Sequence, residues 1–235
     1  MKICFNEFSH LEQTTSSNVI SQSNASLTSF IKLKSVNGKW NENEDSNSLE
    51  DISFEAENGQ LIAIVGPVGS GKSSIFNAIL GEMPTYQGEI QIKGTLSYAS
   101  QEAWVFSGNV RQNILFGQPF DKKRYAEVIR VCDLHQDISK FSHGDLTLVG
   151  ERGIALSGGQ KARVNLARAI YRKADIYLLD DPLSAVDAHV GNHLFHECIR
   201  GFLKDKVVIL ITHLIQYLKG TDEIIVTHEG NDIAQ

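Results

Sequence analysis

The sequence predicts an α/β fold: a mostly parallel sheet covered by helices, with an antiparallel β edge subdomain and an inserted α-helical subdomain. Three observations lead to this prediction. Nearly continuous apolar runs at residues 61–65, 176–179 and 206–212 are typical of strands buried on both faces of a sheet. Segments with helical periodicity separate these runs, as in parallel α/β sheets. A glycine-rich stretch joins the first run directly to a helix.

The individual elements follow from local patterns. Residues 1–29 are rich in Ser, Asn, Thr and Gln and are predicted to be a flexible linker, with a short helix near residues 5–11. Alternation and periodicity predict the rest. These elements are strands at 30–36, 49–54, 61–65, 89–93, 96–100, 176–179, 206–212 and 223–227, a polar loop at 41–45, a turn at 83–88, and helices at 75–80, 123–133, 161–172 and 191–202.

Composition limits the function classes. The 235 residues suffice for one sizeable domain, and 42% hydrophobic with 21% charged residues is ordinary for a soluble globular protein. The net charge of -6 argues against nucleic acid as a partner, because proteins that bind phosphate backbones are usually basic on at least one face. Cys4, Cys132 and Cys198 form no C-x-x-C pair, so we expect free thiols in a reducing compartment.

Membrane contact is expected only through partner segments. No apolar run approaches the about 18 residues that a membrane-spanning helix needs. The first residues also lack the charged and apolar regions of a secretory signal.

A glycine-rich loop follows the strand predicted at 61–65. Its residues are Gly66, Pro67, Val68, Gly69, Ser70, Gly71, Lys72, Ser73 and Ser74. The glycines allow successive N–H groups to wrap a phosphate chain, and the next helix points its positive end at the same place. Lys72 is expected to reach the β- and γ-phosphates, and Ser73 to complete the shell of a Mg²⁺ ion. The pattern G-x-x-x-x-G-K-[ST] in this context predicts a P-loop NTPase core that binds ATP and Mg²⁺, in preference to a plain glycine turn.

A second nucleotide element is the apolar run at 176–179, which ends in Asp180 and Asp181. A carboxylate at the carboxyl end of a strand beside the P-loop can hold the hydration shell of Mg²⁺, and this role is predicted for Asp180. An apolar run that ends in Asp is common by itself. The prediction therefore depends on the P-loop that precedes it.

A third element opens the helix predicted at 161–172: Leu156, Ser157, Gly158, Gly159 and Gln160. Ser157 can cap that helix, and the two glycines leave backbone N–H groups open to an anion. A glycine turn before a helix is the alternative interpretation. The pentapeptide L-S-G-G-Q is the signature of ATP-binding-cassette (ABC) proteins, so the chain resembles their nucleotide-binding domain. The resemblance covers residues 30–235, with 109–172 as the inserted helical subdomain that carries the signature.

The resemblance implies roles for further residues. Gln101 looks like the Q-loop glutamine that touches the metal and reports to the membrane domain, and His213 looks like the switch histidine that contacts the γ-phosphate. Trp40 stands where the family stacks an aromatic ring on adenine, although an exposed loop Trp or a core filler would have the same sequence. Residues 184–187 resemble the D-loop, and residues 149–153 the exporter-type loop that contacts coupling helices.

Three longer stretches resemble the first nucleotide-binding domain of multidrug-resistance-associated proteins, the C subfamily of ABC transporters. They are 104–108 (W-V-F-S-G), 113–117 (N-I-L-F-G) and 179–190 (L-D-D-P-L-S-A-V-D-A-H-V). The resemblance implies a second cassette packed head to tail, transmembrane domains as partners, export of organic anions or conjugates, and a place at the cytoplasmic face of a membrane. Members of this group are far longer, so we expect a fragment or a stand-alone relic.

One position departs from the family pattern. Active members carry a glutamate directly after the metal-holding aspartate, and this chain carries Asp181. A base must sit within hydrogen-bond reach of the proton that it takes, and this carboxylate is one methylene short. We predict good Mg-ATP binding and slow hydrolysis, with Lys72, Gln101 and His213 as the other catalytic residues. An ATP-gated regulatory module is the main alternative. A soluble ABC protein of DNA repair or translation would need coiled-coil arms, a second cassette or a basic surface, which the sequence lacks.

Overall fold

The computed structural model describes residues 28–41, 48–151, 153–228 and 231–234. Nearly all of the predicted linker at 1–29, including its short helix at 5–11, lies outside these residues, as does most of the polar loop at 41–45.

One large sheet organises the molecule. It has nine strands in the order β4-β1-β2-β11-β10-β3-β9-β8-β5. The strands are β1 (Phe30–Gly38), β2 (Leu49–Glu57), β3 (Leu61–Val65), β4 (Thr85–Lys93), β5 (Leu96–Ala99), β8 (Ile176–Asp180), β9 (Val207–Ile211), β10 (Glu223–His228) and β11 (Asn231–Ala234). Strands β10, β3, β9, β8 and β5 pair in parallel, whereas β1 pairs antiparallel with both β2 and β4. This arrangement confirms the predicted α/β class with its antiparallel edge.

The central strands are buried on both faces, as their continuous apolar runs predict. Alternate residues of β8 enter two different core clusters: Leu178 belongs to the cluster that contains Phe76 of the first helix, and Leu179 to the one that contains Leu166 of the long helix α5. Because successive side chains of a strand point to opposite faces, the sheet separates the two cores. Burial of this apolar surface is the main stabilising contribution to the fold.

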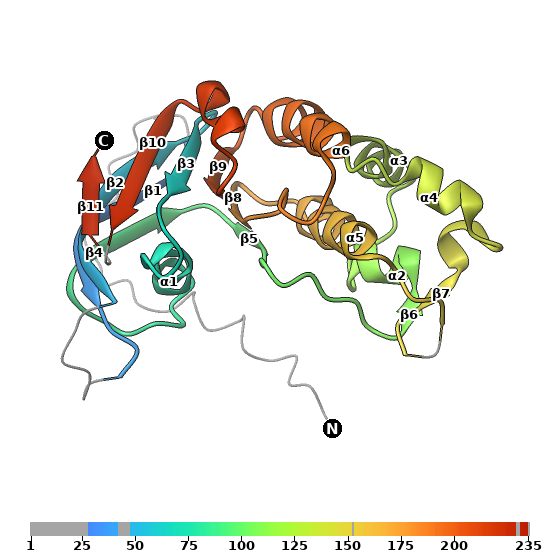
Figure 1. Ribbon diagram of the computed structural model, residues 1–235, viewed down its shortest axis with the longest axis horizontal. Coiled ribbons are helices and arrows are strands. Elements are labelled where there is room, and N and C mark those ends of the chain that lie inside the picture. Colours follow the sequence, from blue (N-terminus) through green and yellow to red (C-terminus); the bar gives the residue numbers. More distant parts are fainter. Residues whose placement is uncertain (1–27, 42–47, 152, 229–230, 235) are drawn as a thin grey trace, which may run out of the picture.

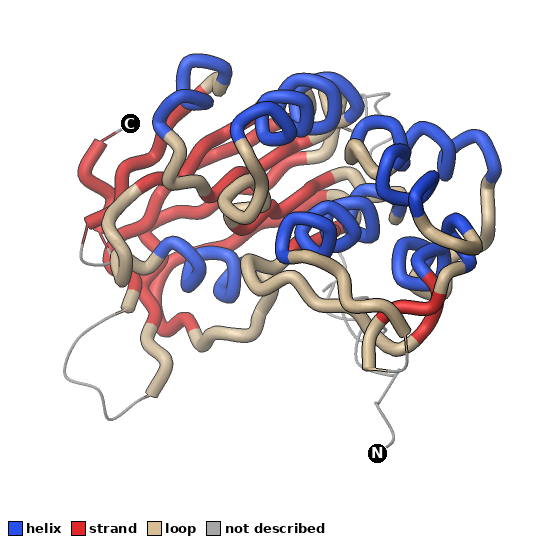
Figure 2. The backbone as a smooth tube through the Cα atoms, turned by 45° about the vertical axis from the view of Figure 1, so that its right-hand side comes forward, coloured by secondary structure: helices blue, strands red, loops and turns tan. Residues whose placement is uncertain are grey.

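The helices gather mainly at one end of the sheet. They are α1 (Lys72–Ile79), α2 (Val110–Leu115), α3 (Lys122–Val131), α4 (His135–Lys140), α5 (Gly158–Tyr171) and α6 (Ala188–His193). A π-helix at Leu194–Phe202 continues α6, and short 3₁₀ turns lie at Gly144–Leu146 and Ile215–Gly220. Helices α2 to α5 and the small sheet of β6 (Gly108–Asn109) and β7 (Leu148–Val149) form a lobe beside β5, opposite the antiparallel strands (Figure 1). Figure 2 shows the strands of the large sheet in one part of the molecule and most helices in the other.

Two local predictions were wrong. The turn predicted at 83–88 ends early, because β4 already begins at Thr85, where Gly38 of β1 is its partner. The alternation is broken at Gly88, which has a φ of 91° and lies beside a register shift in β1. The single helix predicted at 191–202 is instead α6, which begins after the cap Asp187, and a π-helix.

Among the described residues, none of the helices has the length and apolar character that crossing a bilayer requires.

Candidate functional site

The glycine-rich loop connects β3 to α1 in the predicted way. Gly71 is the N-cap of α1 with a φ of 87°, and Gly69 has a φ of 84°, both in the left-handed region that favours glycine. The tip of the loop is open to solvent, with Val68 92% exposed. The N–H groups of the first turn of α1 therefore face the same space as the loop.

The loop is tied to the neighbouring strand β10 by a residue that sequence reasoning missed. Thr227 Oγ1 lies 2.8 Å from Ser70 Oγ and 3.2 Å from the carbonyl oxygen of Val65. A Cβ at Gly66 would lie 2.3 Å from the carbonyl oxygen of Thr227, so only glycine fits there. No local pattern marks a threonine inside a distant strand as a partner of this loop.

The ammonium group of Lys72 lies inside the loop. Its Nζ donates to the carbonyl oxygens of Gly66 at 2.9 Å and Pro67 at 2.6 Å. Burial lowers the pKa of Lys72, and the nearby carboxylates of Asp180 and Asp181 act in the opposite direction. The loop thus holds a positive charge at the point where phosphate oxygens would enter.

Two buried carboxylates face this charge from the end of β8. Burial raises the pKa of Asp180, and hydrogen bonds from the Ser73 and Tyr98 hydroxyls act against that rise. Tyr98, another residue that sequence reasoning missed, lies with its hydroxyl 3.4 Å from Asp180 Oδ2. Asp180 is therefore a buried acid that gains stability from any cation placed beside it.

Asp181 has an unusual backbone and an unused oxygen. Its φ is 48°, its N–H donates to the carbonyl of Ile211 at 3.0 Å, and its side chain is only 5% exposed. Within the described residues its Oδ1 has no hydrogen-bond partner. A buried acceptor without a partner is costly and rare, and this carboxylate lies near enough to Lys72 to interact with its charge.

These residues suit Mg²⁺ held together with phosphates rather than by the protein alone. The part of the chain that the structure describes contains no group of three or more His, Cys, Asp and Glu side chains that could hold a metal. Mg²⁺ typically takes one or two carboxylates and substrate phosphates while keeping several waters. Ser73 and Asp180, which are hydrogen-bonded to each other, provide a donor set of that kind.

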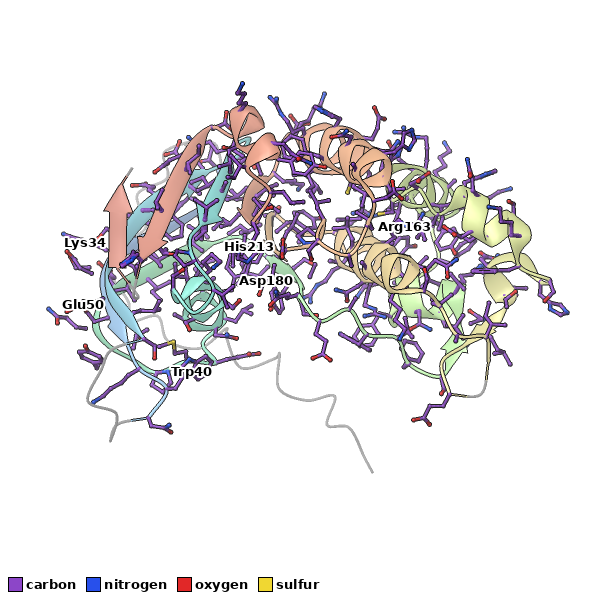
Figure 3. The ribbon with its side chains drawn as sticks, in the orientation of Figure 1. Lys34, Trp40, Glu50, Arg163, Asp180 and His213 are labelled. Atoms are coloured by element: carbon purple, nitrogen blue, oxygen red, sulfur yellow. The ribbon has the colours of Figure 1, made fainter. Side chains whose placement is uncertain are left out.

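The other predicted catalytic residues lie at the same sheet edge. Asp180 of β8 pairs with Ile211 of β9, which places His213 just beyond this edge, and Figure 3 shows Asp180 and His213 close together. Gln101 follows β5, whose last residue, Ala99, pairs with Leu179 of β8. Carboxyl ends of parallel strands are where α/β sheets bind ligands.

Trp40 lies on another side of the loop. The residue is 44% exposed, and its Nε1 donates to Ser74 Oγ at 3.3 Å, which holds the indole against the first turn of α1. Figure 3 shows Trp40 below α1 in this view. An exposed, oriented ring at this position is available for stacking.

The signature residues belong to the helical lobe and do not join this cluster (Figure 1). Ser157 caps α5 and forms a reciprocal capping box with Gln160. Gly158 faces open space, since a Cβ there would meet nothing within 4 Å. The pentapeptide therefore presents a helix N-terminus to the surface instead of to its own P-loop.

Comparison with known proteins gives a consistent result. Residues 49–184 match the family model described as ABC transporter. The chain is 52% identical over 201 residues to ATP-binding cassette sub-family C member 4 of Mus musculus, covering 86% of this chain and 15% of that protein. It is 52% identical over 204 residues to the probable multidrug resistance-associated protein lethal(2)03659 of Drosophila melanogaster (87% and 15%). It is 52% identical over 203 residues to ABC transporter C family member 5 of Arabidopsis thaliana (86% and 13%).

The chain thus spans 13% to 15% of the length of these relatives. All three relatives are C-subfamily members or multidrug resistance-associated proteins by name. The P-loop, the carboxylate pair at the end of β8 and the signature helix occur in one chain with this match. The chain belongs to the ABC transporter family as an ATP-binding domain similar to those of the C subfamily.

Proposed function

We propose that this domain binds Mg-ATP and, paired head to tail with a second cassette, couples ATP binding and hydrolysis to export of organic anions or conjugates across a membrane. It would stand at the cytoplasmic face, as the first of two cassettes, and contact the membrane through transmembrane partner domains. The observation that carries the proposal is the buried pair Asp180 and Asp181 facing Lys72, while the signature points to solvent elsewhere.

Each predicted residue receives a role in this proposal. The loop N–H groups and Lys72 bind the phosphates, Trp40 stacks on adenine, and Ser73, Asp180 and Gln101 hold the Mg²⁺, which neutralises phosphate charge when bound. Asp181 orients the attacking water, and His213 contacts the γ-phosphate.

The head-to-tail pairing follows from the separation of the two nucleotide elements. The exposed N-terminus of α5 can bind an anion, yet it lies in a different lobe from α1. A second cassette can supply a signature to this P-loop and receive this signature in return. ATP would then lie between the two domains, so that binding favours the closed pair.

Hydrolysis at this chain's own P-loop is proposed to be slow. Asp181 keeps the carboxylate but is shorter than glutamate, and a misplacement of about 1 Å can cost roughly a hundredfold in rate. The same feature favours the second candidate, a regulatory module that responds to ATP binding with little hydrolysis.

A complementation experiment tests the pairing. Lys72→Ala disables the P-loop, and Gly158→Arg blocks the signature at a position with room for a side chain. We expect ATP-dependent association, measured by sedimentation, for the natural chain and for an equal mixture of the two variants, because the mixed pair retains one complete site. Each variant alone should stay monomeric, whereas Ser139→Arg, at an exposed position of α4, should associate normally. Association of Lys72→Ala alone, or failure of the mixture, would refute head-to-tail pairing.

A further inference from the structure

The segment that carries Gln101 is attached to α5 at two points. Asn165 Nδ2 donates to the carbonyl oxygen of Ser100 at 3.0 Å, and Arg168 Nη2 donates to the carbonyl oxygen of Trp104 at 3.0 Å. Residues three apart on a helix share a face, so both side chains reach the same side of α5. Gln101 lies between the two attachment points. Figure 1 shows the chain leaving β5 and running along the helical lobe here.

Arg168 is a buried cation of an uncommon kind. It is 8% exposed and, among the described residues, forms no ion pair with a carboxylate. Its hydrogen-bond partners are oxygens of Asn113, Asn165 and Trp104, and its guanidinium carbon lies 3.8 Å from the ring centroid of Trp104. Burial lowers the pKa of Arg168 to about 10. Burying a charge without a counter-ion costs free energy, so stability alone does not account for Arg168, and its hydrogen bonds point to a positioning role.

Asn113 of α2 holds the same segment further along the chain, at Phe106. Asn113 of α2 is buried, accepts a hydrogen bond from the N–H of Phe106 at 3.0 Å and donates to the Phe106 carbonyl at 3.1 Å. Arg168 bonds Asn113 in turn. The chain from Ser100 to Phe106 is therefore held by helices of the lobe, while β5 before it belongs to the large sheet.

We propose that Asn165 and Arg168 are positioning residues: by holding the carbonyl oxygens of Ser100 and Trp104 against α5, they set the position from which Gln101 reaches the Mg²⁺ site. The proposal rests on the metal-binding role of Gln101 given above.

Asn165→Asp removes one hydrogen bond of the attachment with little other change to the side chain. The aspartate keeps an oxygen for Arg168, now as an ion pair, but it cannot donate to the Ser100 carbonyl. Asn37→Asp is the matched control: Asn37 is similarly buried, accepts from the N–H of Asp51 and donates to the carbonyl of Ser35. Both variants make the same chemical change, and only the first touches the Gln101 segment.

The readout is the gain in ATP affinity that Mg²⁺ provides, measured by calorimetry on the full chain with Mg²⁺ and with a chelator. Gln101→Ala should reduce this gain, and Asn165→Asp should reduce it about tenfold, as loss of groups that orient metal ligands does. Asn37→Asp should leave it unchanged. In the Gln101→Ala background, Asn165→Asp should have no further effect, because it acts through Gln101.

The outcomes separate the two proposals. If Gln101→Ala leaves the Mg²⁺ gain intact, the metal role of Gln101 in the proposed function is wrong. If Gln101→Ala lowers the gain but Asn165→Asp does not, or if their effects multiply fully, the positioning proposal is overturned. Thermal unfolding checks that Asn165→Asp is folded, and Asn165→Ala, which removes both hydrogen bonds, replaces it if it is not.

Discussion

Lengthening the carboxylate at position 181 tests the catalytic reasoning most directly. Asp181→Glu moves the carboxylate outward by about one carbon–carbon bond, roughly 1.5 Å. The present Oδ1 is buried without a hydrogen-bond partner in the described structure, so no contact of that atom is lost. Because a misplacement of about 1 Å costs roughly a hundredfold, we expect turnover to rise by about that factor. ATP affinity should stay constant, since the proposed phosphate ligands are the loop N–H groups and Lys72, which the substitution does not change.

The backbone conformation at position 181 makes the same substitution lower the stability of the domain. Asp181 has a φ of 48°, a left-handed conformation that aspartate adopts more readily than glutamate. The variant should therefore lose about 1 kcal/mol in the free energy of unfolding. For a domain of this size the melting temperature should fall by about 2–4 °C. The substitution thus raises the rate while lowering the stability.

The assay is phosphate release from Mg-ATP as a function of protein concentration, with Asp181→Asn as the control. Asparagine has nearly the same shape as aspartate but cannot act as a base, so its rate should fall below that of the natural chain. The rate of Asp181→Glu should rise faster than linearly with concentration if two chains form each site. Equal rates for the natural chain and Asp181→Glu would refute the argument from carboxylate length.

Three further predictions concern single side chains. Asp180→Asn should raise the melting temperature of the nucleotide-free domain at pH 7. Burial raises the pKa of Asp180, so its ionised form costs stability at neutral pH, and the gain should vanish in thermal scans as pH falls toward the ordinary value of 3.8. Phe76→Ala should lower the free energy of unfolding by about 3–5 kcal/mol in urea titrations, because the ring is fully buried behind the P-loop. Ile215→Ala, at a position 79% exposed, should change the free energy of unfolding by less than about 0.5 kcal/mol. A similar loss for Phe76→Ala and Ile215→Ala would contradict the burial argument. Trp40→Ala should weaken ATP binding about tenfold in calorimetry, as loss of one stacking partner does, and Trp40→Phe should retain most of the affinity. Unchanged affinity in Trp40→Ala would remove Trp40 from the proposed adenine site.

Local sequence patterns predicted most of the sheet. The strands β3, β8 and β9 are continuous apolar runs, and a strand buried on both faces needs such a run whatever its neighbours are. The pattern predicted the second half of β4 at 89–93 but missed residues 85–88, because Gly88 interrupts the alternation and pairing with β1 extends the strand. It also failed to predict β11, which pairs with β10 and β2 from the far end of the chain.

In the candidate site, too, residues in local motifs were predicted and residues that act through distant contacts were missed. Loop glycines, Lys72 and Asp180 were predicted because a phosphate loop and a strand-end carboxylate are encoded in consecutive residues. Thr227, Tyr98 and Arg168 were not, since each acts through contacts between segments distant in the sequence.

The sequence alone determined the family, the class of nucleotide site and the short carboxylate at Asp181, because these depend on residue identity and spacing. Tertiary structure decided the left-handed backbone and unpartnered oxygen of Asp181, the separation of the signature from the P-loop, and the attachment of the Gln101 segment to α5. These features arise when side chains far apart in the chain compete for the same buried hydrogen bonds and space, and no local period records the result of that competition.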